Sequence, residues 1–577
     1  MSAALWGARP LEADRWRFAL WAPSAREVML QLDGTDHAMT RDAGGHWQTD
    51  VTARDGLPYV FRVDGEDRPD PLSRHQQGGP LSPSLTVDAR RFDWGAPWDG
   101  RPLHDAVIFE LHVGSFTTEG TFTAAARRLP DLAALGITCV ELMPVSQFEG
   151  ARGWGYDGVL IAAPHPAYGT PDELRAFVRQ AQELGMMVLL DLVMNHFGPF
   201  GNALPAYAPE FFSDTHTPWG GGIDFAKLPV QAFFREAAVS WLKDYRLDGF
   251  RLDAVHEIRD GQDQRFLRDL AVKLREEVRD RPIHLICEDE RNLTHLRENG
   301  FDAEWNDDWH NALHVALTGE TQGYYDRFAA DPFGDIAHAL ARGQVDEGQS
   351  RPARNGDGPD GYLPPRGAPA AHLPWTAFVN ANLTHDQAGN RPEGRRLISL
   401  VGEDPARTVH AALLLMPFVP MLFMGEEEGS TTPFHFFCDP PTDDGRDAVR
   451  KGRARELSAI GYDTSNIPDP CAVATMEACR PYPAPDPARA EDWRALTRQL
   501  TQIRAAKIVP LLASGKIGEG DVSRHGRAFE VRWPFNAGRL HMRLSLGDPL
   551  PGPALEAPDF RLGQPGHDSF SIEVQIT

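Results

Sequence analysis

Eight short apolar segments, separated by helical patterns, run through the middle of the chain and constrain its fold more than any other feature. They are AVIFELHV (106–113), TCVELMPV (138–145), MVLLDLVM (187–194), GFRLDA (249–254), HLICED (284–289), DAEWND (302–307), TAFVNANL (376–383) and PMLFMGEE (420–427). Most are nearly continuous apolar runs, which is typical of strands covered on both faces. No glycine-rich phosphate loop follows any of them, which disfavours an open nucleotide-binding sheet. The pattern therefore predicts an α/β fold, a (β/α)8 TIM barrel.

Short alternating segments flank this region on both sides. Residues 1–88 contain WRFALWAP, VMLQLDG, HWQTDV and YVFRVDG, which predict an N-terminal immunoglobulin-like β-sandwich. Residues 89–104 are rich in Pro and Gly and are interpreted as a linker. The barrel is expected to span residues 105–515, including a long mobile excursion at 326–374. Residues 516–577 return to short alternating runs, which predict a small C-terminal all-β domain.

Charge and cysteine content exclude several classes of partner. The net charge of −24 argues against nucleic acid and against anionic membranes, because both need a basic surface. The five cysteines form no CxxC pair, which indicates a reduced, cytoplasmic setting. The first residues show no secretion signal, and no apolar run approaches the length of a membrane span. We therefore expect a cytoplasmic enzyme with a neutral substrate. The sequence leaves the oligomeric state open between a monomer and a homodimer.

Acidic residues gather at the predicted carboxyl ends of the strands, where the active sites of such barrels lie. They are Glu110, Glu141, Asp191, Asp253, Glu288, Glu304, Asp386 and Glu426. One such acid could simply cap a helix, but so many at one rim would repel each other. Phosphate chemistry would need a basic cradle and redox chemistry a nucleotide fingerprint, and the chain shows neither. Glycoside hydrolysis, which uses a pair of carboxylates, is the best match.

The segment GFRLDAVH (249–256) carries two charges on one face of a short strand. Arg251 and Asp253 are two residues apart, so their side chains point the same way. A buried ion pair seldom adds stability, because both groups lose their hydration. A functional role explains this pair better than a structural one.

Four short motifs follow in order along the predicted strands: DLVMNH (191–196), GFRLDAVH (249–256), ICEDE (286–290) and THDQ (384–387). Together they resemble the motifs of the α-amylase family of glycoside hydrolases. Longer segments, such as FDAEWNDDWHNALHVALTGETQGYY, resemble more narrowly the maltooligosyltrehalose trehalohydrolases of that family. The resemblance covers nearly the whole chain and makes the N-terminal sandwich similar to a carbohydrate-binding module. It implies a retaining glycoside hydrolase that cleaves the α-1,4-glucosidic bond next to the trehalose end of maltooligosyltrehalose. The products would be trehalose and a maltooligosaccharide, which implies a role in trehalose biosynthesis.

The match assigns three acids to catalysis. Asp253 resembles the nucleophile, Glu288 the general acid/base, and Asp386 the third acid, which grips sugar hydroxyls. The retaining mechanism implies that the carboxyl groups of Asp253 and Glu288 lie about 5–5.5 Å apart. Arg251 is expected to keep Asp253 ionised by lowering its pKa.

The resemblance also implies a set of substrate-binding residues. They are Tyr156, Asp157, Asp191, His196, Arg251, His256 and His385. Trp154 and Trp219 are further candidates for stacking on sugars, although core packing is at least as compatible with each. Asn195 completes the first motif and helps bind calcium in many amylases. The excursion after the third strand is short and lacks a carboxylate cluster, so we expect no required metal and no cofactor.

Four residues depart from the trehalohydrolase pattern. Leu383 and Thr384 replace other residues before the third acid, Glu428 stands where a tryptophan is common, and Ala162 replaces a residue that is commonly aromatic. All lie at predicted strand ends, where we expect the substrate, so they bear on substrate preference.

Two other functions stay open at this point. A glycogen branching or debranching enzyme of the same family would share the N-terminal sandwich and the acids. A non-catalytic glycan-binding scaffold would also keep the barrel, but the retention of Asp253, Glu288 and Asp386 together argues against it.

Overall fold

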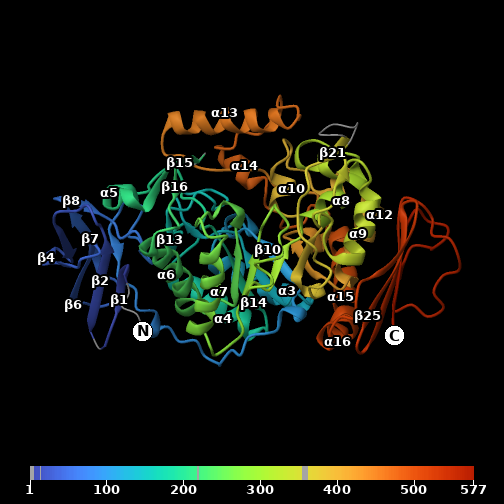
Figure 1. Ribbon diagram of the computed structural model, residues 1–577, viewed down its shortest axis with the longest axis horizontal. Coiled ribbons are helices and arrows are strands. Elements are labelled where there is room, and N and C mark those ends of the chain that lie inside the picture. Colours follow the sequence, from blue (N-terminus) through green and yellow to red (C-terminus); the bar gives the residue numbers. More distant parts are fainter. Residues whose placement is uncertain (1–4, 13, 218–219, 354–360) are drawn as a thin grey trace.

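The computed structural model describes residues 5–12, 14–217, 220–353 and 361–577 (Figure 1). Within these residues, parallel strands close into a barrel in the order β10-β11-β14-β17-β18-β19-β22-β23. Their bounds are Ile108–Leu111, Cys139–Leu142, Met187–Leu192, Gly249–Leu252, His284–Cys287, Ala303–Trp305, Phe378–Ala381 and Val419–Phe423. Each lies within a segment predicted as a strand, apart from one residue at the start of β23. The predicted (β/α)8 barrel is confirmed.

Alternate residues of the barrel strands point inward and form layers. The layer near the strand starts is apolar and includes Ile108, Cys139 and Met187. The inward residues nearer the carboxyl ends are charged on several strands. Asp191 of β14 lies opposite Arg251 of β17 in the strand register, so the sheet itself brings this pair together. The barrel therefore brings Arg251 and Asp191 together at the end that holds the site.

Amphipathic helices cover the outside of the barrel. They are α2 (Phe122–Ala126), α3 (Leu129–Ala134), α4 (Pro171–Glu183), α6 (Leu228–Asp244), α7 (Arg265–Glu277), α8 (Asp307–Thr318), α12 (Glu403–Leu415) and α15 (Pro487–Ile503). Pro130 stands in the first turn of α3 and separates it from α2, as its missing N–H predicts. No helix in the described part of the chain is long and apolar enough to cross a membrane.

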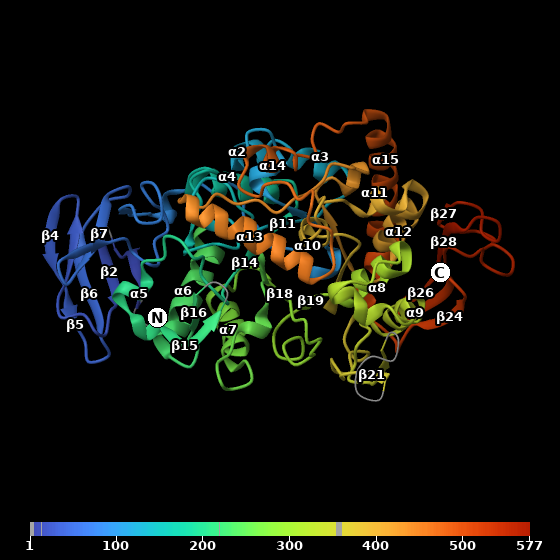
Figure 2. The same ribbon diagram turned by 90° about the horizontal axis from the view of Figure 1, so that it is seen from above.

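Separate β-domains stand at the two ends of the molecule (Figure 2). The N-terminal domain packs the sheet β1 (Gly7–Pro10), β2 (Arg15–Trp21), β6 (His46–Thr52), β5 (Thr40–Arg41) against the sheet β4 (Thr35–Ala38), β3 (Val28–Leu32), β7 (Pro58–Val63), β8 (Glu66–Arg68). The C-terminal sheet has the order β24 (Asp521–His525), β25 (Ala528–Phe535), β26 (Gly538–Leu546), β28 (Phe570–Ile576), β27 (Phe560–Leu562). Both predicted β-domains are confirmed as elements of the fold.

The excursions hold structure that the sequence did not lead us to expect. The segment 326–374, predicted as a long mobile excursion, contains the helix α9 (Pro332–Arg342), which packs on α8. The helix α13 (Asp443–Ala459) was also not predicted, because its sequence DDGRDAVRKGRARELSA has few apolar residues. Figure 1 shows α13 above the barrel, and Figure 2 shows it crossing the barrel when seen from above. A hairpin of β15 (Phe212–Thr217) and β16 (Gly220–Ile223) lies on the same side.

Candidate active site

The three acids predicted to be catalytic line a single cavity of about 740 Å³, here called the active-site cavity. Asp253 follows β17, Glu288 follows β18, and Asp386 lies in the short helix α10 (His385–Gly389) after β22. Their side chains are 14%, 18% and 34% exposed, so all three reach the cavity while remaining largely enclosed. The barrel thus gathers acids that are far apart in the sequence.

Arg251 lies beneath this cavity and binds three carboxylates at once. Its Nη1 donates to Asp191 Oδ2 at 2.8 Å and to Asp253 Oδ1 at 2.9 Å. Its Nη2 lies 2.8 Å from Glu288 Oε2. The guanidinium carbon also lies 4.1 Å from the centre of the Trp305 ring, a cation–π contact. Because the arginine is only 1% exposed, it acts as a fixed cation shared by the acids around it.

The surroundings shift the pKa values of the two acids at the centre of the cavity in opposite directions. Burial on its own raises the pKa of Asp253. The cation of Arg251, the charge of His196 and a 2.8 Å hydrogen bond from Asn195 outweigh burial and lower this pKa. For Glu288, burial prevails over the attraction of Arg251, and the negative charge of Asp253 adds to it, so its pKa lies well above the ordinary value. These opposite shifts favour an ionised Asp253 beside a protonated Glu288, the arrangement that a nucleophile and a general acid require.

The rings of Tyr156 and His385 are hydrogen-bonded to each other and form one wall of the active-site cavity. His385 Nδ1 lies 2.5 Å from Glu110 Oε1, and its Nε2 lies 2.9 Å from the Tyr156 hydroxyl. Burial lowers the pKa of His385, but Asp386 and Glu110 outweigh burial and raise it to about 9. The Tyr156 hydroxyl also donates to Asp191 at 2.6 Å, and its ring stacks on the imidazole with centroids 5.3 Å apart. Tyr156 is therefore locked in place as a flat surface facing the cavity.

Backbone groups also hold the acids in position. Ala254 has a left-handed conformation, with φ 39° and ψ 54°, and its N–H donates to Glu288 Oε2 at 2.8 Å. A non-glycine residue in this conformation carries about 1–3 kcal/mol of strain, which is typical of functional sites. Thr384 caps α10 by accepting a hydrogen bond from the N–H of Asp386 at 3.2 Å.

The predicted substrate-binding residues divide into three groups. Tyr156, His196, His256 and His385 line the active-site cavity. Asp191 and Arg251 lie beneath it, so the structure favours a positioning role for them. Asp157 faces an adjoining cavity, where burial raises its pKa. Trp154 lines both cavities, and Trp219 lies outside the described residues.

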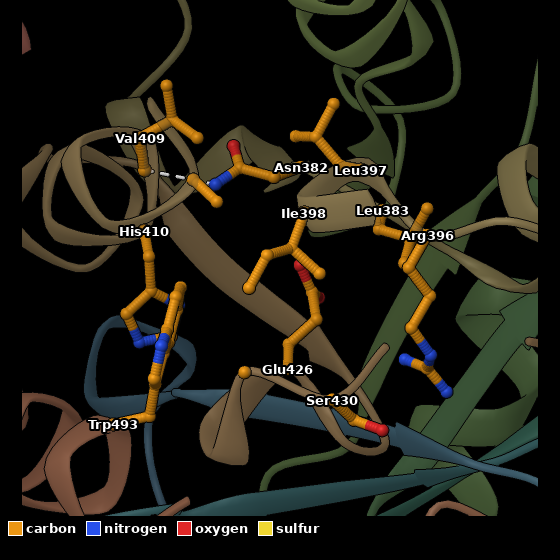
Figure 3. Close-up of a pocket in the computed structure, with 12 residues that line it drawn as sticks. Asn382, Leu383, Arg396, Leu397, Ile398, Val409, His410, Glu426, Ser430 and Trp493 are labelled. Carbon is orange, nitrogen blue, oxygen red and sulfur yellow. Dashed lines mark hydrogen bonds between the residues drawn. The ribbon is translucent and has the colours of Figure 1, made fainter. Parts of the chain in front are cut away.

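Other acids from the predicted strand ends do not line the active-site cavity. Glu426 faces a separate small pocket behind the barrel rim, where its carboxyl group points toward Ile398 (Figure 3). Burial raises its pKa to about 8. Glu304 forms an ion pair with Arg297 at 3.1 Å, and Glu141 is buried inside the barrel. The expectation that all these acids meet at one rim was wrong for Glu426 and Glu304. Glu141 does lie with the other acids, because burial raises its pKa and the charges of Glu110 and Asp191 raise it further.

The departures from the family pattern lie mostly away from the cavity. Glu428 accepts a hydrogen bond from Arg494 at 2.8 Å in a groove between α3 and α15. Ala162 is fully buried in β13 (Leu160–Pro164), and Leu383 lines the pocket of Figure 3. Thr384 touches the site only through its capping bond to Asp386. The prediction that all four lie where substrate binds was therefore wrong for Glu428, Ala162 and Leu383.

Two residues near the site were not singled out from the sequence. Trp305 packs on Arg251, and Asp307 is partly buried. The loss of hydration and the charge of nearby Asp386 raise the pKa of Asp307 to about 7. Both belong to the segment DAEWND (302–307). Its position at the carboxyl end of a predicted strand could have marked them as candidate site residues. Among the described residues no cluster of His, Cys, Asp or Glu could hold a metal ion. The expectation that no metal is required remains a prediction.

Comparisons with known proteins agree with this arrangement. Residues 94–204 match the family model described as "Alpha amylase, catalytic domain", and residues 5–79 match "Carbohydrate-binding module 48 (Isoamylase N-terminal domain)". A malto-oligosyltrehalose trehalohydrolase of Deinococcus radiodurans is 40% identical over 476 residues, covering 82% of this chain and 78% of that protein. A crystal structure of a candidate alpha amylase from Salmonella typhimurium has a TM-score of 0.92 at 41% identity, covering 99% of each chain. A 1,4-alpha-glucan branching enzyme of Bordetella parapertussis is 34% identical but covers only 44% of this chain and 39% of its own.

Proposed function

The chain belongs to the malto-oligosyltrehalose trehalohydrolases, glycoside hydrolases of the α-amylase family, and from this premise we propose that it releases trehalose from maltooligosyltrehalose. The bond cleaved is the α-1,4-glucosidic bond next to the trehalose unit. The observation that carries the proposal is that Asp253 and Glu288 open into one cavity and both contact the guanidinium buried beneath it. It supports the close carboxylate spacing of retaining enzymes, about 5–5.5 Å.

In the first step, the ionised Asp253 attacks the anomeric carbon of the sugar at the cleaved bond. Glu288 gives its proton to the leaving oxygen, and trehalose departs with that oxygen. The raised pKa of Glu288 supports this role, because the proton must be present at neutral pH. The product of the step is a glycosyl ester on Asp253.

In the second step, Glu288 is ionised and takes a proton from water. The oxygen of that water attacks the anomeric carbon, the ester bond breaks, and Asp253 leaves as a carboxylate. Asp386, which opens into the same cavity, binds hydroxyl groups of the distorted sugar. Hydroxyl contacts of this kind that tighten in the transition state supply several kcal/mol.

Product analysis tests the proposal against the other functions in the family. Incubation with a defined maltooligosyltrehalose should yield free trehalose and a maltooligosaccharide. New α-1,6 branches on an α-glucan would instead identify a branching enzyme, and cleavage of such branches a debranching enzyme. Asp253→Asn should abolish turnover while leaving substrate binding, and unchanged turnover would contradict the role of Asp253.

The setting of the enzyme belongs to the same proposal. Release of trehalose supports a place in trehalose biosynthesis. The five cysteines are all free thiols, which supports a reducing, cytoplasmic location. We propose a monomer or a homodimer, with no nucleic acid or membrane partner.

A further inference from the structure

The third acid of the active-site cavity is held by fewer contacts than the other two. Asp253 and Glu288 each contact a buried guanidinium and accept a further hydrogen bond. Within the described residues, the carboxyl group of Asp386 accepts a single hydrogen bond, from Asn390 Nδ2 to its Oδ1 at 3.2 Å. His385 Nε2 lies 3.5 Å from the same oxygen but is hydrogen-bonded to a tyrosine hydroxyl. The direction in which Asp386 points therefore depends on how the amide of Asn390 is turned.

Arg453 of α13 fixes the orientation of that amide. The helix crosses the barrel rim beside α10, the short helix that carries Asp386 (Figure 2). Nη1 of Arg453 donates to Asn390 Oδ1 at 3.3 Å, and its Nη2 donates to the carbonyl oxygen of Gly389. A guanidinium group only donates hydrogen bonds, so it selects the oxygen end of the amide. The NH2 end of Asn390 must then face Asp386.

The burial of Arg453 is not explained by the docking of α13 alone. Gly445, Arg453 and Leu457 are the buried residues of this helix, so its inner face carries a charge. Glu456 lies 2.9 Å from the guanidinium but is 59% exposed, so solvent weakens this ion pair. An apolar side chain would hold the helix on the barrel without the cost of burying a cation. A role in the site explains the arginine better than a role in docking.

The carboxyl end of α10 is closely packed where Arg453 meets it. A Cβ atom on Gly389 would lie 2.1 Å from the Trp154 ring, so only glycine allows this contact. The guanidinium carbon of Arg453 lies 5.3 Å from the centre of the Phe436 ring, and that ring packs edge-on against Trp154 with centroids 5.3 Å apart. Because these groups contact one another, a change at Arg453 acts directly on the residues beside Asp386.

We propose that Arg453 is a positioning residue for the reaction, which orients the amide of Asn390 and, through it, the carboxyl group of Asp386. This inference rests on the proposed trehalose-releasing activity, in which Asp386 binds hydroxyl groups of the distorted sugar. It gives α13 a role in the chemical step.

The variant Arg453→Met tests this role, because it keeps much of the side-chain length and removes the donors. The matched control is Arg455→Met, the same substitution at an exposed position of the same helix. Trehalose release is measured on two substrates, one with a single glucose on the trehalose unit and one with an arm of several glucose units. We expect Arg453→Met to lower kcat about tenfold or more on both substrates with little change in KM, since misplacing a group by about 1 Å can cost about 10²-fold. Arg455→Met should match the wild type on both.

The variant Asn390→Ala separates the orientation of Asp386 from the docking of α13. It removes the amide but leaves the hydrogen bond from Arg453 to the Gly389 carbonyl, so the helix keeps this contact. We expect the same loss of kcat as in Arg453→Met. Because both changes break the same chain of hydrogen bonds, the double variant should lose no more than the larger single loss.

Each outcome decides the proposal. A loss confined to the long arm and to KM would mean that Arg453 only contacts remote sugars, which overturns the proposal. An unchanged kcat in folded Arg453→Met or in Asn390→Ala, or losses that multiply in the double variant, also overturn it. If Arg453→Met does not fold, Arg453→Lys keeps the charge without the planar fork and must lower kcat on both substrates by a smaller factor; an unchanged kcat there overturns the proposal as well. A wild-type enzyme that releases no trehalose from either substrate would instead refute the proposed function.

Discussion

Removal of Arg251 perturbs the electrostatic centre of the site, because one guanidinium serves three carboxylates. Arg251→Met keeps much of the side-chain length but leaves Asp191, Asp253 and Glu288 without contacts of 2.8–2.9 Å. Removing one partner of a buried ion pair costs about 3–5 kcal/mol. Protonation of a carboxylate relieves part of this cost, so we expect the free energy of unfolding to fall by about 3 kcal/mol. The pKa of Asp253 should rise, because the cation that offsets the effect of burial on this carboxyl group is gone.

The assay is the initial rate of trehalose release as a function of pH, together with urea unfolding. The acid limb of kcat/KM reports ionisation of the nucleophile in the free enzyme, so it should move to higher pH in Arg251→Met. Arg251→Lys is the matched control, because it keeps the positive charge but loses the planar fork, and its limb should move less. A folded Arg251→Met variant with an unmoved acid limb would refute the reasoning that Arg251 keeps Asp253 ionised.

Three further predictions follow from the same site. Glu288→Gln should lower kcat by about 10²–10⁴-fold on maltooligosyltrehalose. On a substrate whose leaving group needs no proton, the first step should proceed at nearly the wild-type rate. An equal loss on both substrates would contradict the role of Glu288 as the general acid. His385 binds its proton more tightly in the folded chain, with a pKa of about 9, so its stabilisation is complete below its unfolded pKa of about 6.5 and is lost as pH rises through 9. Urea unfolding of wild type and His385→Gln across this window should therefore show a difference that shrinks by about 3 kcal/mol, and a constant difference would contradict the assigned charge. Dialysis against EDTA should leave kcat unchanged, whereas a loss reversed by Ca²⁺ would show a metal requirement.

The sequence predicted the barrel well because its strands are buried on both faces. Each barrel strand is a short, largely apolar run. The acids at the ends of these runs were candidates for the site because the active sites of such barrels lie at the carboxyl ends of the strands. The motif matches could predict that Asp253, Glu288 and Asp386 lie near one another, because each comes shortly after the end of a barrel strand. Apolar runs and short motifs can be recognised from neighbouring residues alone, so no knowledge of the folded structure is needed to find them.

Other parts of the site depend on contacts that no local pattern reveals. Glu426 and Glu428 stand at a strand end like the catalytic acids, but a turn aims them into separate pockets. The helix α13 has no clear apolar stripe, because one of its faces borders a cavity and the other borders solvent. Its place above the barrel, and the link from Arg453 to Asp386, follow only from the folded structure.

The most direct test of the account is to trap the covalent intermediate. A fluorinated maltosyl fluoride that forms the ester quickly but hydrolyses slowly is incubated with the enzyme, and the peptides are then examined by mass spectrometry. The account predicts one sugar adduct, on the carboxylate of Asp253. A sugar on another acid, or none while the reagent is turned over, would contradict it.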